Sequence, residues 1–452
     1  MKTIKTIVLL MSILAQLSFA QDSSQFRLRL GLSLADFPQN FQSAHPLPSA
    51  EQSVELSEDL YDLSFWGISA LSHAVVRNAK HTLLGGLLQQ GVEYGLGFAF
   101  AKYGSELPIP LGVFTHEEFH SDVLGSAGYS SLNGNSLFNR WDGTAYGVTD
   151  EELTRLKADN LATLLYSYVA GVQSETYLTE RGVLDDFYHR RSFYKGPLYL
   201  YNALYVWDYF HFAASPESDA VKQIAPAYES PDPFYRDYAG ADLTAWIFDM
   251  FGPTSPYTSG RAAFPNGNGV NRRVGFSDLT PEGQDYLKKQ ELLSLLNFVN
   301  PAIFTLNRIS IGPELETLFF LQYSPTNFGN DIALFLPVKY KQLNHLLAFH
   351  LYGNSTKSFV GLRYGLAELR PLTGVPLAFS PALSFWVQPE SQGFYDATGK
   401  VGGSLQIETT YELGESFAIA GSVSYKTEGW MLGNPYLGKS FGFRCGVKYK
   451  LL

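Results

Sequence analysis

Residues 440–451 read SFGFRCGVKYKL, and apolar or aromatic side chains occupy every second position of this stretch. Successive side chains of a β-strand point to opposite faces, so this alternation predicts a strand with one apolar and one polar face. The apolar set is Phe441, Phe443, Cys445, Val447, Tyr449 and Leu451, opposite Gly442, Arg444, Gly446, Lys448 and Lys450. The stretch therefore indicates a sheet that separates an apolar medium from a polar one.

The same alternation recurs through the last third of the chain. It predicts eight strands, at residues 309–323, 330–340, 343–353, 357–369, 374–388, 401–413, 416–426 and 440–451. Short turns rich in Gly, Asn, Pro, Ser and Asp separate most of them, which is the spacing of an antiparallel meander. We expect residues 305–452 to form a β-barrel of about eight strands, the smallest common transmembrane barrel. Charged side chains would fill its narrow lumen and neutralise one another: Glu314, Glu316, Arg363, Glu408, Arg444 and Lys448.

This pattern resembles the β-barrels of bacterial outer membranes. Tyrosines and phenylalanines near the predicted strand ends are similar to the aromatic girdles of such barrels. Alternation alone does not say which face is outside. A soluble β-sandwich or a lipocalin-like barrel, with an apolar interior and a polar exterior, therefore stays as the alternative.

Residues 21–304 have a different period, because their apolar side chains recur mainly at helical spacing. Helices are predicted at residues 59–79, 82–103, 111–125, 150–180, 197–214, 241–251 and 281–300. Thr280 and Pro281 supply an N-cap and a first-turn proline for the last of these helices. Residues 215–240 and 252–277 are rich in Pro, Gly, Ser, Asn and Tyr and are expected to be surface loops. The predicted fold class is α+β, a mainly helical domain followed by the barrel.

The first twenty residues are typical of a secretory signal peptide. Lys2 and Lys5 precede an apolar stretch at residues 7–17, and Ser18 to Ala20 offers a cleavage point. The resemblance places the chain outside the cytoplasm, in the outer membrane of a Gram-negative envelope, with membrane lipid as a partner. The net charge of −10 and the lack of a basic run exclude an electrostatic footprint for nucleic acid. A single cysteine, Cys445, excludes an intrachain disulfide.

The strongest chemical motif is the HExxH pentapeptide at residues 116–120. On a helix, His116 and His120 lie one turn apart on one face, so both imidazoles can bind one Zn²⁺ ion. Glu117 then lies beside the metal, where it can take a proton from metal-bound water. The motif resembles that of the zincin metallopeptidases, although Glu118 occupies a position that is usually apolar in that family. The longer metzincin pattern is excluded, because Val123 and Ser126 stand where its glycine and third histidine would be.

A catalytic zinc site needs a third protein ligand. A gluzincin-like arrangement takes a glutamate from a later helix, and Glu175 is the candidate. It extends an apolar stripe formed by Leu161, Leu165, Tyr168 and Val172, where a carboxylate is costly unless it is paired or bound to a metal. Thr179 stands where that family has a further acidic residue. Asp122, His189 and His211 are the alternatives for this third position.

The developing oxyanion of such a hydrolase also needs a hydrogen-bond donor. Tyr177, His189 and His211 are candidates, and the sequence does not choose among them. His73 and His81 are read as packing or surface histidines, and His345 and His350 lie in predicted strands without metal-like partners.

Two other readings of the chain remain open. Glu117 and His120 also match the E-x-x-H of di-iron bundles, in which Asp186 and His189 would be a degenerate second copy. Glu93 and Glu175 would then complete the carboxylate set. A rival from a different class is a non-enzymatic outer-membrane barrel whose helical periplasmic or plug domain acts in binding or assembly. The leading prediction is a zinc-dependent hydrolase of the cell envelope, a peptidase in which Glu117 is the general base and a peptide or protein is the substrate.

Overall fold

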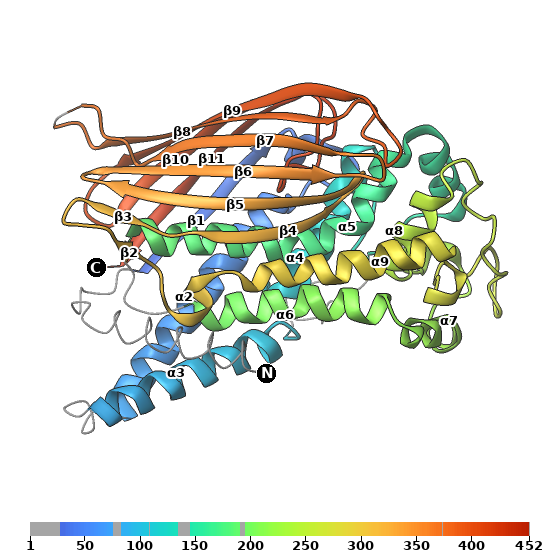
Figure 1. The fold of residues 1–452 in the computed structure, drawn as a ribbon, viewed down its shortest axis with the longest axis horizontal. Coiled ribbons are helices and arrows are strands. Elements are labelled where there is room, and N and C mark those ends of the chain that lie inside the picture. Colours follow the sequence, from blue (N-terminus) through green and yellow to red (C-terminus); the bar gives the residue numbers. More distant parts are fainter. Residues whose placement is uncertain are drawn as a thin grey trace.

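The helical and the strand-forming parts of the chain lie in two layers (Figure 1). The computed structural model describes residues 28–75, 83–107, 109–133, 145–189, 195–372 and 374–451. The predicted signal peptide at residues 1–20 and His81 lie outside the described residues, as does the side chain of His73. The α+β class predicted from the sequence is confirmed, with the helices first and an antiparallel meander after them.

Within the described residues the sheet has eleven strands, all in antiparallel pairs. They are β1 (Leu28–Phe37), β2 (Ile309–Ser310), β3 (Leu315–Thr317), β4 (Phe320–Thr326), β5 (Gly329–Tyr340), β6 (Leu343–Gly353), β7 (Ser358–Ala367), β8 (Leu377–Pro389), β9 (Gly399–Glu412), β10 (Phe417–Lys426) and β11 (Ser440–Leu451). From β5 to β11 they pair in sequence order, as the alternation predicts. The first predicted strand, 309–323, is instead divided among β2, β3 and β4.

The prediction of a closed barrel is not met, because the described strands form an open sheet. Its edges are β1, which pairs with β11, and β2, which pairs with β3. The strand β1 was not predicted, and its antiparallel register runs from Leu28 opposite Leu451 to Phe37 opposite Phe443. Helices pack against the inner face of the sheet, α2 on β1 and α5 on β4. In the predicted eight-stranded barrel, strand side chains would fill the lumen and leave no room for these helices. The sheet is instead open, and the helices pack against it.

Two of the six charged side chains expected to neutralise one another inside a barrel, Arg363 and Arg444, form ion pairs with helices. Arg363 Nη1 donates to Glu180 Oε1 of α5 over 2.7 Å. Arg444 forms an ion pair with Glu51 of α2 and lies 3.6 Å from Glu408 of β9, which is on the same face of the sheet. The polar face of the sheet is therefore the face that binds the helical layer.

The opposite, outward face of the sheet exposes large apolar side chains. The exposed set includes Leu32, Leu34, Phe349, Leu351, Val360, Leu383, Phe385, Val401, Leu405, Ile407, Phe417, Ile419, Val423, Phe441, Phe443 and Val447. These residues come from β1 and from six neighbouring strands, β6 to β11. The polar side chains of the alternating pattern thus lie on the inner face of the sheet, and the apolar side chains lie on its outer face.

Eight α-helices are described in the first two thirds of the chain. They are α2 (Ala50–Val75), α3 (Leu83–Gly104), α4 (Gly112–Ser126), α5 (Asp150–His189), α6 (Gly196–Ala213), α7 (Val221–Ile224), α8 (Asp242–Phe251) and α9 (Pro281–Ser294). The predicted cap is present, since the Thr280 side chain accepts a hydrogen bond from the backbone of Gly283. Among the described residues, no helix has the length and apolar character needed to cross a membrane.

Helix α5 is the centre of the helical layer. It bends at Asn160, whose φ of −153° and ψ of 65° are not helical. Beyond this bend, every residue from Thr163 to Thr176 is buried. α5 contacts α4 and α8 on one side and the sheet on the other, so one helix connects the two layers (Figure 1).

Candidate metal centre

The HExxH pentapeptide lies on α4, as the sequence predicts, and every residue of α4 from Phe114 to Gly125 is buried. α4 is enclosed mainly by α5 and α2. The exposed fractions of His116 and His120 are only 5% and 2%. Both imidazoles are therefore held in a protein interior, where an unpaired polar group is costly.

The third member of this group is Asp242, in the first turn of α8. Its Oδ2 atom lies 3.3 Å from Nε2 of His116 and 3.3 Å from Nε2 of His120. Within the described residues, this is the one cluster of three or more His, Cys, Asp or Glu side chains close enough to hold a metal ion. Asp242 was missed from the sequence because it lies more than a hundred residues after the histidines and reads as an ordinary first-turn acid.

The spacing of these three atoms fits a tetrahedral ion. Ligand atoms that lie about 2.0–2.1 Å from a tetrahedral Zn²⁺ stand about 3.3 Å from one another. The two distances from Asp242 Oδ2 have this value. Two imidazole nitrogens and one carboxylate oxygen also form a donor set typical of zinc.

Gly171 of α5 leaves the space for such an ion. A Cβ atom at this position would lie 2.3 Å from His116 Nε2 and 2.4 Å from His120 Nε2. These values are close to a Zn–N bond length of about 2.0–2.1 Å. The absent side chain of Gly171 thus marks a space that is metal-sized and directly faces both ligand nitrogens.

The second ring nitrogen of His120 has a hydrogen-bond partner, whereas that of His116 forms no hydrogen bond and has an ion-pair contact. His120 Nδ1 lies 2.5 Å from the carbonyl oxygen of Ser167, so Nδ1 carries a proton and Nε2 is left for a metal. His116 Nδ1 lies 3.4 Å from Oε1 of Glu175. Such outer contacts fix the tautomer and orientation of metal-binding histidines.

Glu175 therefore touches the far side of the His116 ring and is not a member of the His116, His120 and Asp242 group. It and Gly171 lie four residues apart on one face of α5. The sequence stripe thus identified the helix face that meets the histidines. The position closest to their Nε2 atoms is occupied by the glycine, one turn earlier.

Burial and charge shape the protonation of the site. Burial raises the pKa of Glu117 to about 7, although both histidines act to lower it. Burial lowers the pKa of His116, but the carboxylates of Glu175 and Asp242 outweigh that effect and hold the pKa well above its usual value. Burial raises the pKa of Asp242, but His120 and His116 hold it well below its usual range. The cluster is electrostatically suited to a cation.

Two tyrosines of α6 complete the surroundings of the cluster, and sequence reasoning missed both. Tyr209 donates a hydrogen bond to Asp242 Oδ2 over 2.7 Å. The rings of Tyr205 and Tyr209 each lie 6.1 Å from the ring of His116. Their spacing of four residues on α6 could have suggested one aromatic face, but nothing local connects that face to residues 116–120.

The acidic residue at the usually apolar position of the motif has a structural explanation. Glu118 Oε2 lies 2.8 Å from Nε2 of His45, and both side chains are buried. Glu118 therefore points away from the metal group and joins α4 to the segment before α2.

The other candidates for the third ligand or the oxyanion donor are engaged elsewhere. Tyr177 donates to Glu51 over 2.7 Å, and Asp122 accepts a hydrogen bond from the backbone of Ala50. His189 pairs with Asp185, and the half-exposed His211 pairs with Glu291.

The residues of the di-iron reading do not converge either. Asp186 accepts a hydrogen bond from Tyr199, and Glu93 accepts one from Ser72. Neither belongs to the one metal-sized cluster found among the described residues.

The molecule thus combines a helical layer, an open antiparallel sheet and a buried His-His-Asp group that could hold a metal ion. The chemistry of the site rests on this geometry. Comparison with protein-family models, with curated proteins and with solved structures finds no match to this chain.

Proposed function

We propose that the chain is a zinc-dependent hydrolase of the cell envelope and that it cleaves peptide bonds. His116, His120 and Asp242 would hold the zinc ion. The observation that carries the proposal is the position of Asp242 Oδ2, 3.3 Å from the Nε2 atoms of both HExxH histidines. The space opposite Gly171 supports the same assignment.

The chain's own residues have separate roles in this proposal. When bound, the zinc ion supplies a Lewis acid and lowers the pKa of a coordinated water molecule to about 7. Glu117 would act as the general base and acid, taking a proton from the attacking water and giving one to the leaving amine. A glutamate side chain can carry out both transfers. Glu175 acts as a positioning residue that holds the His116 ring.

Tyr205 is our candidate for the oxyanion donor. Its ring stands 6.1 Å from the His116 ring, and its side chain is only partly buried. Burial raises the pKa of Tyr205 well above its usual value, so the hydroxyl group keeps its proton at neutral pH and can donate a hydrogen bond.

The proposed location is the outer membrane, with lipid against the outward face of the sheet. The support is the continuous set of exposed Leu, Ile, Val and Phe side chains on β1 and β6 to β11. A monomeric soluble protein rarely exposes an apolar surface of that extent. The signal-peptide pattern of residues 1–20 is in keeping with this location.

The second candidate function is non-enzymatic, with the helical domain acting in binding or assembly. One observation favours it: His116, His120, Glu117 and Asp242 are each at least 93% buried. A metal ion enclosed in this way could serve the fold alone, as structural zinc sites do.

Metal analysis combined with a peptidase assay separates the two functions. The purified full chain is expected to contain one zinc ion and to cleave a fluorogenic peptide library. Asp242→Asn should lose both the zinc and the cleavage, while Glu117→Gln should keep the zinc and lose the cleavage. Glu118→Gln is the matched control, because Glu118 pairs with His45 and should leave both properties intact.

Two results would count against the proposal. Folded, metal-free wild-type protein would exclude the zinc site. Stoichiometric zinc with no peptide cleavage in the wild type would leave the ion a structural role and favour the non-enzymatic function.

A further inference from the structure

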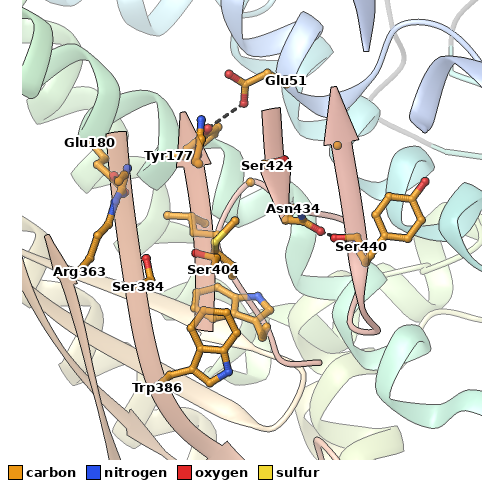
Figure 2. Close-up of a pocket in the computed structure, with 18 of the residues that line it drawn as sticks. Glu51, Tyr177, Glu180, Arg363, Ser384, Trp386, Ser404, Ser424, Asn434 and Ser440 are labelled. Carbon is orange, nitrogen blue, oxygen red and sulfur yellow. Dashed lines mark hydrogen bonds and ion pairs between the residues drawn. The ribbon is translucent and has the colours of Figure 1, made fainter. Parts of the chain in front are cut away.

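A polar chamber lies between the inner face of the sheet and helices α2 and α5, apart from the metal group. Its cavity has a volume of about 130 Å³. Figure 2 shows Glu51, Tyr177 and Glu180 on the helical side, facing Ser384, Ser404, Ser424 and Trp386 on the strands. None of the three metal-group residues lines it.

The chamber exists because small side chains meet on neighbouring strands. Ser384 of β8 is directly opposite Ser404 of β9, and Ser424 of β10 is opposite Gly442 of β11. Elsewhere on this face, long side chains such as Arg363 and Arg444 reach the helices. The serines stop short of α5 and leave a hollow.

Most of the charged side chains on the walls of the chamber are paired. Glu51 is paired with Arg444 and Arg181 and also accepts a hydrogen bond from Tyr177. Glu180 is paired with Arg363 over 2.7 Å. A second set on β5 and β6 repeats this arrangement, since Asp331 Oδ2 lies 2.8 Å from His350 Nδ1. Asp36 also lines the chamber; it accepts a hydrogen bond from Ser49, and Arg444 acts to lower its pKa. The chamber therefore offers little uncompensated charge to a bound anion or cation.

Several polar groups that line the chamber have no hydrogen-bond partner within the described part of the chain. The hydroxyl groups of Ser384, Ser404 and Ser424 form no hydrogen bond that the structure records. Gln322 is 5% exposed, and its Oε1 atom is buried without a hydrogen bond. Asp331 is 4% exposed, and its Oδ1 atom is also buried without a hydrogen bond. Buried polar atoms are nearly always satisfied in native proteins, so Gln322 Oε1 and Asp331 Oδ1 point to a bound polar molecule. The three serines are partly exposed and line the same cavity.

Aromatic rings form part of the same walls. Trp386 and Trp430 are 4% and 2% exposed and both line the cavity. Tyr352 lines it as well and meets Trp430 edge to face at 6.4 Å. Flat aromatic surfaces beside hydroxyl and amide groups suit a ligand with both apolar C–H faces and a rim of hydroxyl groups.

From this combination we propose that the chamber binds a neutral, hydroxyl-rich ring, of the chemical class of a single pyranose sugar. An engineered cavity of about 150 Å³ accommodates one benzene molecule, so a pyranose ring needs this cavity of about 130 Å³ together with the adjoining hollow of about 380 Å³. The hydroxyl substituents of the ring would point to the three serines and Gln322. The adjoining hollow shares Glu51, Tyr177 and Gln406 with the chamber and gives room for substituents. We expect the ligand to be uncharged because most charged side chains on the chamber walls are already paired.

Calorimetric titration of the purified full chain tests the proposal, with glucose and N-acetylglucosamine as probes and sodium acetate as a charged control. Saturable binding of at least one sugar in the millimolar range or tighter, without binding of acetate, is expected. Ser404→Leu fills the hollow and should weaken that binding at least tenfold. Leu405→Val, on the outward face of the same strand, is the matched control and should leave it unchanged.

Saturation-transfer NMR on the wild-type chain gives a second readout that does not depend on the folding of Ser404→Leu. Transfer to the ring protons of the bound sugar is expected, because Trp386 and Tyr352 line the cavity. Absence of saturable binding of both sugars in both experiments would overturn the proposal. Equal binding by the wild type and a folded Ser404→Leu variant would also do so, because the sugar would then bind elsewhere.

Discussion

Replacing Gly171 by alanine places a methyl group in the space that we assign to the metal ion. The new Cβ atom would lie 2.3 Å from His116 Nε2 and 2.4 Å from His120 Nε2. Non-bonded heavy atoms prefer about 3.5–4.0 Å, so each imidazole must retreat by about 1 Å or more. A Zn–N bond of about 2.0–2.1 Å does not survive such a displacement.

The expected loss of zinc affinity is large. Removing an outer-shell partner of a metal ligand typically costs about 10–100-fold in affinity. Gly171→Ala displaces two of the three ligands themselves, so we expect a loss beyond about 100-fold. The helix itself should persist, because alanine is a better helix former than glycine by about 1 kcal/mol.

The assay combines metal content after dialysis with thermal unfolding in the presence and absence of a chelator. A ligand at about a thousand times its Kd stabilises the folded state by about 4 kcal/mol, so the chelator should lower the Tm of the wild type. The Tm of Gly171→Ala should not respond to the chelator. Gly182→Ala is the matched control, because it makes the same change on α5 against Tyr199, away from the metal group. Stoichiometric zinc and a chelator-sensitive Tm in Gly171→Ala would refute the assignment of this space.

Three further predictions follow from the contacts described above. Glu175→Gln should keep the fold and weaken zinc binding by about 10–100-fold in a chelator competition, since Glu175 holds the His116 ring; unchanged affinity would remove it from the site. Burial raises the pKa of Asp59 to about 8. The folded state therefore binds more protons than the unfolded state between about pH 4 and 8. The free energy of unfolding should fall as the pH rises through that window. Asp59→Asn should make this fall smaller in denaturant titrations, and parallel curves for the two proteins would contradict the shift. Leu405→Lys on the outward face should reduce the free energy of unfolding in lipid vesicles by about 2–4 kcal/mol. Leu413→Lys, beyond the strand end, should reduce it by only about 0–1 kcal/mol. Equal reductions would argue against a bilayer around the sheet.

Local periodicity predicted the elements of this molecule well, because it reports contacts that each segment makes along its whole length. The helix around His116, the cap at Thr280 and the strands from β5 to β11 all have such signals. The strand β1 has one as well, in the alternation of Leu28, Leu30, Leu32 and Leu34, and it was overlooked because it follows the signal-peptide pattern directly.

The open form of the sheet could not be predicted from the sequence, for a physical reason. Alternation shows that one face of a strand is polar, but it does not show what that face touches. Arg363 and Arg444 are equally suited to a water-filled or side-chain-filled lumen and to a helix that carries Glu180 or Glu51. The packing of α2 and α5 on the sheet depends on contacts between segments that are far apart in sequence.

The metal group shows the same division. The two histidines were identified by their spacing of four residues, whereas Asp242 comes from a helix whose approach to α4 is set only by tertiary packing. Gly171 carries no sequence signal at all, since its importance lies in the side chain that it lacks.

Diffraction from crystals of the full chain, recorded on both sides of the zinc absorption edge, tests the central claim most directly. The account predicts a single strong anomalous peak about 2.0–2.2 Å from His116 Nε2, His120 Nε2 and Asp242 Oδ2, in the space beside Gly171. A zinc-supplemented crystal without a peak there, or with a peak coordinated by Glu175 in place of Asp242, would contradict it.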